Sequence, residues 1–272
     1  MSDADLMSDA DLVQTAIGRT TMAAKLAIFS DIHANFPAMG EVASHIRDND
    51  YDGVYCLGDL GGYASEPNET QELVMFMDCL TVLGNYDEGV GFNNDTCGCN
   101  YVKPFDIKMS DVSFGWTRQH TADAHKVWLR TLPREIRFES EGKRILLCHG
   151  SPASTTEYLF GTRSEAYLQK FTAGGRNDAH ADVIVFGHTH VPYHRVVDGV
   201  HFVNTGSVGR PKDGDPRAGY CVLTIDDDQV TTEQIRLEYD VEAACSRLLA
   251  AGLPEYFADY LRTGGSVSTP AV

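Results

Sequence analysis

Short apolar runs that end in polar residues alternate along the chain with segments whose apolar residues recur at helical spacing. Residues 25–33, KLAIFSDIH, are such a run and predict a buried strand. From Asn35 to Asp48 the apolar residues lie three or four apart, with Pro37 near the start, which predicts a helix. The next expected elements are a strand, a helix and a short strand, at residues 52–60, 66–80 and 81–85. This order favours a parallel sheet.

The rest of the chain divides into a helical insert and a second β-rich part. Residues 86–103 are rich in Gly and Asn and predict a long loop, and residues 104–132 predict helix, so we expect an insert over about 86–132. The later apolar runs predict strands at 143–151, 182–190, 194–199, 200–207, 218–226 and 230–239, with a helix from Ser164 to Thr172 and a helical pair at 241–262. We therefore expect an α/β (mixed α+β) fold, with two mixed sheets packed face to face and helices outside.

One large domain accounts for this pattern. Residues 25–264 are expected to form it, with residues 1–24 as a disordered leader and residues 265–272 as a frayed tail. The hexamer MSDADL occurs twice, at 1–6 and 7–12, but it is too short to be the unit of a repeat architecture.

The composition narrows the possible partners. The chain has 272 residues, 43% of them hydrophobic, which is typical of an ordinary globular protein. Its net charge of −17 repels nucleic acid and anionic membranes, so we expect neither as a partner. A phosphate substrate would also be repelled, unless local cations such as bound metals reverse the field. There is no apolar run of about 20 residues and no signal-peptide pattern, so a cytoplasmic location is expected.

The seven cysteines are scattered, and their odd number argues against a disulfide framework. Cys97 and Cys99 form the one close pair. They could bind a metal or sense redox state, but no second Cys or His pair lies nearby, so a structural loop is favoured.

Polar side chains that can bind metals follow five of the predicted strands. In chain order they are Asp31 and His33, Asp59, Asn85, His149, and His188 and His190. Each alone has a simpler interpretation, as a solvated strand tip, a capped turn or a core histidine. Ligand sites in parallel sheets form at the carboxyl ends of strands, and all five segments fall there. Together they predict one shared metal site.

The order DxH, GDxxGY, GNxD, HG and GHTH resembles the motifs of the calcineurin-like metallophosphoesterase superfamily over residues 25–220. The run NTGSVGRPKDGDPRAGY at 204–220 is similar to a segment of its small bacterial and archaeal phosphodiesterase-like branch. The resemblance implies a four-layer α-β-β-α sandwich and a binuclear metal-dependent phosphoesterase that uses a metal-bridging hydroxide. It also implies that one metal is held by Asp31, His33 and His190, the second by Asn85, His149 and His188, and that Asp59 bridges them.

This donor set suits Mn²⁺, Fe, Ni²⁺ or Zn²⁺ better than Ca²⁺, with Mn²⁺ favoured. Asn85 and His149 are also expected to orient the phosphate. Family phosphatases usually have histidine where this chain has Tyr86, and that histidine is thought to protonate the leaving oxygen. Tyr86 is the candidate catalytic residue at this position: it could donate a proton, but with its usual pKa near 10 it is poorly matched to neutral pH. His120 or His125 could replace that acid, although solvated helix positions are the simpler interpretation.

The missing histidine favours a phosphodiesterase acting on a small or nucleotide-like phosphodiester. Loss of a general acid slows hydrolysis least when the substrate has a good leaving group. The alternatives are a phosphomonoesterase, such as a nucleotidase or phosphoprotein phosphatase, and a non-catalytic scaffold; the scaffold is disfavoured because all seven ligand positions are filled. Arg163, Arg210 and Arg217 are candidate phosphate ligands or surface ion-pair residues. Tyr63, Tyr86 and Tyr158 could stack on a base or pack in the core. The sequence indicates no oligomeric state.

Overall fold

A computed structural model describes residues 23–227 and 229–267. The first strand begins at Ala24, one residue before the predicted start of the domain. Most of the predicted leader, residues 1–22, and the end of the predicted tail, residues 268–272, lie outside the described residues.

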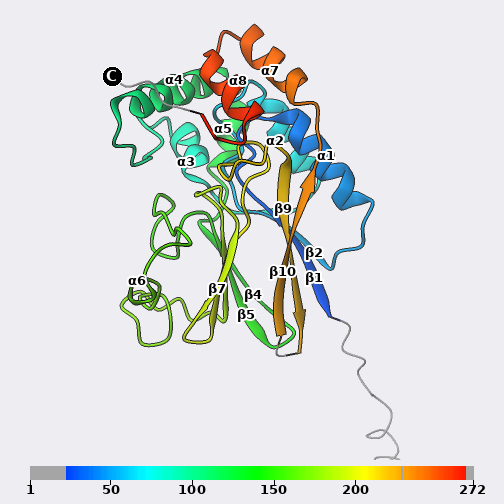
Figure 1. Cartoon of the computed structure of the whole chain (residues 1–272), viewed down its shortest axis with the longest axis vertical. Helices are drawn as coiled ribbons and strands as arrows, with labels where there is room; N and C mark the ends of the chain where they lie inside the picture. Colours follow the sequence, from blue (N-terminus) through cyan, green and yellow to red (C-terminus); the bar gives the residue numbers. More distant parts are fainter. Residues whose placement is uncertain (1–22, 228, 268–272) are drawn as a thin grey trace, which may run out of the picture.

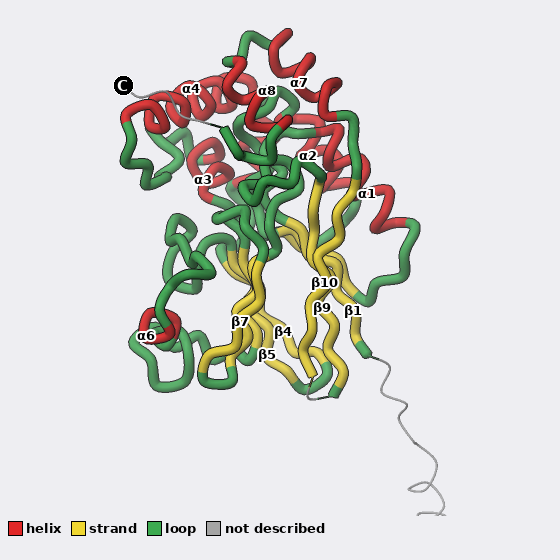
Figure 2. The backbone as a smooth tube through the Cα atoms, viewed as in Figure 1, coloured by secondary structure: helices red, strands yellow, loops and turns green. Residues whose placement is uncertain are grey.

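Two five-stranded mixed sheets form the centre of the protein, and Figure 2 shows them as two separate groups of strands. The first sheet has the order β10 (Gln229–Leu237), β9 (Ala218–Asp226), β1 (Ala24–Phe29), β2 (Gly53–Cys56), β3 (Leu80–Thr81). The second has the order β4 (Glu135–Ser140), β5 (Lys143–Cys148), β6 (Val183–Phe186), β8 (Val200–Asn204), β7 (Tyr193–Val197). Within them β1, β2 and β3 are parallel, as are β5, β6 and β8.

Most helices gather at the upper end of the two sheets in Figure 1, and they are divided unequally between the sheets. Those that pack with the first sheet are α1 (Phe36–Arg47), α2 (Pro67–Phe76), α3 (Asn85–Gly91), α4 (Pro104–His120), α5 (Asp123–Leu129), α7 (Val241–Ala250) and α8 (Glu255–Arg262). The second sheet is covered by the short α6 (Glu165–Leu168) and by the chain around it. The predicted four-layer sandwich is confirmed, with a fourth layer made largely of loop.

The core divides into layers because side chains alternate along a strand. In β1, Leu26 and Ile28 face the second sheet, whereas Ala27 and Phe29 face the helices. Both sets are fully or nearly fully buried. A strand buried on both faces reads as a continuous apolar run, which is why KLAIF was recognisable in the sequence.

Some predicted elements were wrong in detail. Residues 86–103 were predicted as loop, but residues 86–91 belong to α3, which begins at Asn85 because the Asp87 carboxylate accepts a hydrogen bond from the Gly84 N–H at its start. The predicted helical stretch 104–132 is two helices, and the helix predicted from Ser164 to Thr172 is the single turn α6. Strand β4 was not predicted. No helix among residues 23–227 and 229–267 has the length and apolar character needed to cross a bilayer.

Candidate metal centre

The ligand-bearing segments meet because the parallel strands of both sheets end at the same edge of the sandwich. Asp31 and His33 follow β1, Asp59 follows β2, Asn85 follows β3, His149 follows β5, and His188 and His190 follow β6. The two sheets are joined there by a hydrogen bond of 2.9 Å from the His188 N–H to Oδ2 of Asp31. All seven residues are at most 3% exposed.

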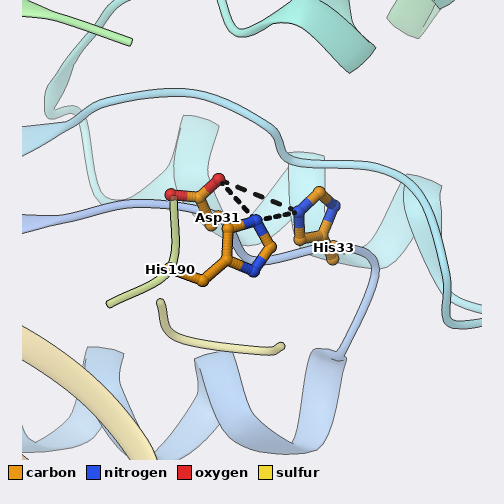
Figure 3. A group of neighbouring side chains, drawn as sticks. All are labelled: Asp31, His33 and His190. Atoms are coloured by element: carbon orange, nitrogen blue, oxygen red, sulfur yellow. Dashed lines mark hydrogen bonds and ion pairs between the residues drawn. The ribbon is translucent and has the colours of Figure 1, made fainter. Parts of the chain in front are cut away.

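Asp31, His33 and His190 form the first group of ligands (Figure 3). Nε2 of His190 lies 3.2 Å from Oδ1 of Asp31, and Nε2 of His33 lies 3.8 Å from the same oxygen. The two imidazole Nε2 atoms are 3.1 Å apart. Three donor atoms therefore converge on one point.

Asp59, His149 and His188 form the second group. Oδ2 of Asp59 lies 3.4 Å from Nε2 of His149 and 3.8 Å from Nε2 of His33 in the first group. The Asn85 amide oxygen lies 3.0 Å from Nε2 of His149 and so belongs to the same cluster. One carboxylate oxygen thus faces both groups, as a bridging ligand requires.

Backbone carbonyls fix the orientation of three of the imidazoles. Nδ1 of His33 bonds to Gly61 O at 2.9 Å, and Nδ1 of His149 bonds to Leu57 O at 2.8 Å. Nδ1 of His190 bonds to the backbone oxygen of Arg210 at 2.5 Å. A carbonyl can only accept, so each Nδ1 carries the proton and each Nε2 is left as a donor atom for a metal.

The amide of Asn85 is oriented by the loop that contains the cysteine pair. Its nitrogen donates to the Cys97 carbonyl at 2.8 Å and lies 3.3 Å from the Cys99 sulfur, which turns its oxygen toward His149. The two thiols are free and 2.8 Å apart. This geometry agrees with a structural role for the loop, one that also supports a ligand.

Backbone strain is concentrated at these residues. Asp31, His33, Asp59, His188 and His190 have φ between 51° and 62°, in the left-handed region that side-chain-bearing residues rarely adopt. Each such residue costs on the order of 1 kcal/mol or more, and strain of this kind clusters at functional sites. The strain turns the side chains inward at the ends of strands β1, β2 and β6.

Burial shifts the pKa values of the histidine ligands, and it leaves several polar atoms of the centre without a hydrogen-bond partner. Burial lowers the pKa of His190 to about 4 and the pKa of His33 and His188 well below their usual value. Burial also disfavours the charged form of His149, but the nearby Asp59 carboxylate outweighs it and raises the pKa to about 9. Oδ1 of Asp31 and both ring nitrogens of His188 are buried with no hydrogen bond.

Orphaned buried polar atoms of this kind are expensive unless something binds them. The carboxylate, amide and imidazole donors present here suit divalent transition metals. The residues therefore fit two cations, and the two buried groups with the family described below indicate divalent metal ions.

Two glycines let the backbones approach this closely. A Cβ at Gly187 would lie 2.1 Å from Oγ of Ser30 and 2.4 Å from Oδ2 of Asp31. A Cβ at Gly84 would lie 2.3 Å from Oδ1 of Asp59. Only glycine fits at either position, which explains the glycines of the GHTH and GNxD motifs.

Residues outside the predicted ligand set complete the centre. The Asp87 carboxylate accepts hydrogen bonds from the N–H groups of Asp59, Leu60 and Gly84, at 2.8, 2.9 and 3.0 Å, and so holds the turn that carries Asp59. Lys212, Tyr101 and Cys99 line the cleft over the ligands together with Tyr63, Tyr86 and Tyr158. Lys212 lies in the Gly-rich segment 204–220, the only sequence signal that could have pointed to it.

Several candidates from the sequence lie away from the centre. His120 is exposed and stacks on Trp116, and His125 bonds to Asn68. Arg217 forms an ion pair of 2.6 Å with Asp215, and Arg163 lies over the ring of Tyr167 at 4.5 Å. These side chains are therefore held by other partners.

The candidate tyrosines and Arg210 do lie beside the ligands. The Tyr158 ring packs against the His188 imidazole, with ring centroids 4.1 Å apart. The Tyr63 ring and the His33 imidazole are nearly perpendicular, with ring centroids 5.0 Å apart. Tyr86 also contacts His33, but its hydroxyl bonds to Ser113 Oγ at 3.1 Å, and burial raises its pKa well above its usual value.

The fold and this donor arrangement define a phosphoesterase of the metal-dependent kind. Residues 24–228 match the calcineurin-like phosphoesterase superfamily domain. The chain belongs to this family, which confirms the resemblance seen in the sequence.

Similar proteins of full length come from archaea and bacteria. The chain is 29% identical over 256 residues to the uncharacterized protein MJ0912 of Methanocaldococcus jannaschii, covering 88% of this chain and 98% of that one. It is similar to the crystal structure of a metallophosphoesterase from Sphaerobacter thermophilus, with 26% identity and a TM-score of 0.70. The match covers 89% of this chain and 100% of that one. The hypothetical protein PH1004 of Pyrococcus horikoshii OT3 shares the fold, with 18% identity and a TM-score of 0.75. The match covers 90% of this chain and 100% of that one.

Proposed function

We propose that the protein is a binuclear metal-dependent phosphodiesterase that hydrolyses a small or nucleotide-like phosphodiester. The observation that carries the proposal is the position of Asp59 Oδ2, 3.8 Å from Nε2 of His33 and 3.4 Å from Nε2 of His149. A carboxylate oxygen between two groups of ligands suits a pair of cations. The Sphaerobacter metallophosphoesterase has a similar fold over its whole length, which supports the same class of reaction.

Two divalent cations bound here would polarise a phosphoryl oxygen and lower the pKa of a water molecule, so that a nucleophile forms near neutral pH. The residues of the chain hold and orient the reactants. We assign the positioning of the phosphate to the Asn85 amide and the His149 imidazole, which are held by hydrogen bonds to Cys97 O and Leu57 O. Lys212 lines the same cleft and adds positive charge.

The choice of diester over monoester depends on the leaving group. Among the described residues that line the cleft, the histidines are His33, His188 and His190, all of them proposed ligands. The Tyr86 hydroxyl is bonded to Ser113, which favours a packing role over the proton-donor role predicted from the sequence. Without an imidazole acid the site favours esters whose leaving oxygen needs little protonation.

Hydrolysis of bis(4-nitrophenyl) phosphate and 4-nitrophenyl phosphate, compared after metal reconstitution, tests the reaction. We expect the diester to be the better substrate by kcat/KM, and a monoester preference of about tenfold or more would contradict the proposal. Metal analysis of the freshly purified protein should find two ions per chain, with Mn²⁺ the favoured ion and Fe, Ni²⁺ and Zn²⁺ the alternatives.

Replacement of the bridging carboxylate tests the binuclear assignment. Asp59→Asn keeps the shape of the side chain but removes its charge, so we expect it to lower both metal content and hydrolysis, the latter by about a hundredfold or more. Asp111→Asn, at an exposed position of α4, is the matched control. Unchanged metal content and activity in Asp59→Asn would show that Asp59 is not a ligand.

A further inference from the structure

The guanidinium of Arg210 lies buried between two tyrosine rings. Its Cζ is 3.7 Å from the ring centroid of Tyr63 and 3.9 Å from that of Tyr260, and the residue is only 5% exposed. Rings on both faces leave only the edge of the guanidinium, with its N–H groups, free to donate.

No carboxylate or carbonyl among the described residues satisfies that edge. Nη1 is buried without a hydrogen bond, and the hydrogen bonds of Arg210 within the described chain involve its backbone. Arg217, seven residues further along the same segment, instead pairs with Asp215 through two nitrogens. A buried, unpaired arginine in a chain of net charge −17 lacks the anion that normally accompanies it.

The unpaired guanidinium lines a pocket of about 260 Å³. Tyr101, Tyr256 and Lys212 also line it, and the described residues form no hydrogen bond or ion pair with the Lys212 ammonium. Asp106 is the carboxylate among the lining residues, and it forms no ion pair with Arg210. The positive charges of Arg210 and Lys212 outnumber the single negative charge of Asp106, so the pocket suits an anion.

This pocket adjoins the metal centre. Tyr63, Tyr101 and Lys212 line both the pocket and the cleft over the metal ligands. The Tyr63 ring lies between the Arg210 guanidinium and the His33 imidazole, with centroid distances of 3.7 Å and 5.0 Å. The pocket and the cleft are therefore neighbours that share part of their lining.

We propose that Arg210 and Lys212 bind a second phosphate group of the substrate, beside the phosphodiester that is cleaved. The inference rests on the proposed phosphodiesterase activity and narrows its substrate class to phosphodiesters that carry a further phosphate. A guanidinium edge donates two parallel hydrogen bonds to a phosphate, and an ammonium adds a point charge. The alternative is a purely structural role, in which the Tyr63–Arg210–Tyr260 stack only attaches α8 to the segment 204–220.

A pair of matched substrates separates these roles. Thymidine 5′-(4-nitrophenyl phosphate) carries only the phosphodiester, and its 3′-phosphorylated form carries a second phosphate as well. We expect the full-length, metal-reconstituted protein to prefer the 3′-phosphorylated form by about tenfold in kcat/KM, chiefly through KM. In Arg210→Gln this preference should fall about tenfold. Lys212→Gln, at a half-buried position, should lower it in the same direction, and it also tests the pocket if Arg210→Gln does not fold.

The control is Arg217→Gln, because Arg217 belongs to the same segment but is paired with Asp215. It should leave the preference unchanged. A wild-type protein that does not distinguish the two substrates would overturn the proposal. So would an Arg210→Gln protein that folds and loses activity equally on both substrates, which indicates a packing role, or a Lys212→Gln protein that keeps the full preference for the 3′-phosphorylated form.

A binding measurement keeps this inference separate from the proposed activity. Thymidine 3′,5′-bisphosphate and thymidine 5′-monophosphate are titrated calorimetrically into the wild-type protein and each variant. Tighter binding of the bisphosphate that is lost in Arg210→Gln or Lys212→Gln supports the pocket even if neither ester is hydrolysed. Equal affinities for the two nucleotides in the wild type would contradict it.

Discussion

His33 and His190 present unprotonated ring nitrogens to each other, with their Nε2 atoms 3.1 Å apart. Each Nδ1 carries the ring proton and donates a hydrogen bond to a backbone carbonyl, so neither Nε2 carries a hydrogen. Two lone pairs at this distance repel unless a cation lies beside both. The contact is therefore more informative than either histidine alone.

Loss of one of these nitrogens should remove an ion. We expect His190→Ala to lower the metal content measured by plasma mass spectrometry from about two ions to about one per chain, and hydrolysis by about a hundredfold or more. His120→Ala, at the exposed end of α4, serves as the control and should retain both. Full metal content in His190→Ala would remove it from the set of ligands.

Metal removal should destabilise the fold as well as stop hydrolysis. A ligand that binds only the folded state stabilises that state by about 2.7 kcal/mol when its free concentration is about 100 times its Kd. In a protein of this size that corresponds to a rise in Tm of about 5–10 °C for each ion. Scanning calorimetry of the chelator-treated protein, before and after Mn²⁺ is added back, measures the difference. An identical Tm in both states would argue that the buried groups do not bind the ion.

Tyr86→Phe distinguishes packing from proton donation. The Tyr86 hydroxyl bonds to Ser113 rather than facing the ligands, so we expect kcat to stay within about threefold and stability to fall by about 1 kcal/mol. Tyr220→Phe is the matched control, because the buried Tyr220 hydroxyl bonds to His45 and Tyr51. A loss of about a hundredfold in kcat for Tyr86→Phe alone would restore the role predicted from the sequence.

Gly187→Ala should disturb the centre through shape alone. The added methyl would lie 2.1 Å from Ser30 Oγ and 2.4 Å from Asp31 Oδ2, so the two strand ends must separate. We expect a loss of about 1–3 kcal/mol in the free energy of unfolding, together with weaker metal binding. At Gly40 in α1 a Cβ meets nothing within 4 Å, and Gly40→Ala should instead stabilise the helix by up to about 1 kcal/mol. Denaturant unfolding measures both, and equal effects would exclude the steric explanation.

The sequence predicted those parts of the protein that depend on local pattern. Continuous apolar runs identified β1, β5 and β6, and the polar residues directly after them identified most of the ligands. Strand β4 was missed although Ile136 and Phe138 alternate with charged residues, a period of two that was readable. The single turn α6 and the extra helix α3 are too short to show a helical periodicity, and α3 depends on the Asp87 carboxylate at its start.

Residues whose role depends on distant neighbours could not be predicted in this way. Lys212 and Tyr101 reach the cleft only because the segments that carry them fold over the ligands. Arg210 was recognised as a candidate, but its isolation between Tyr63 and Tyr260 is a property of three separate segments. The hydroxyl direction of Tyr86 likewise depends on Ser113 in α4.

The division of the ligands between the two sheets has a consequence for assembly. His33 and His190 are 157 positions apart in the chain, and neither sheet alone supplies a complete set of donors. During synthesis the first sheet must wait for β9 and β10, which come after every ligand. A tightly held ion would therefore mark a chain in which the first sheet is complete, because a chain that ends between His190 and β9 has every proposed ligand but lacks the strand that pairs with β1.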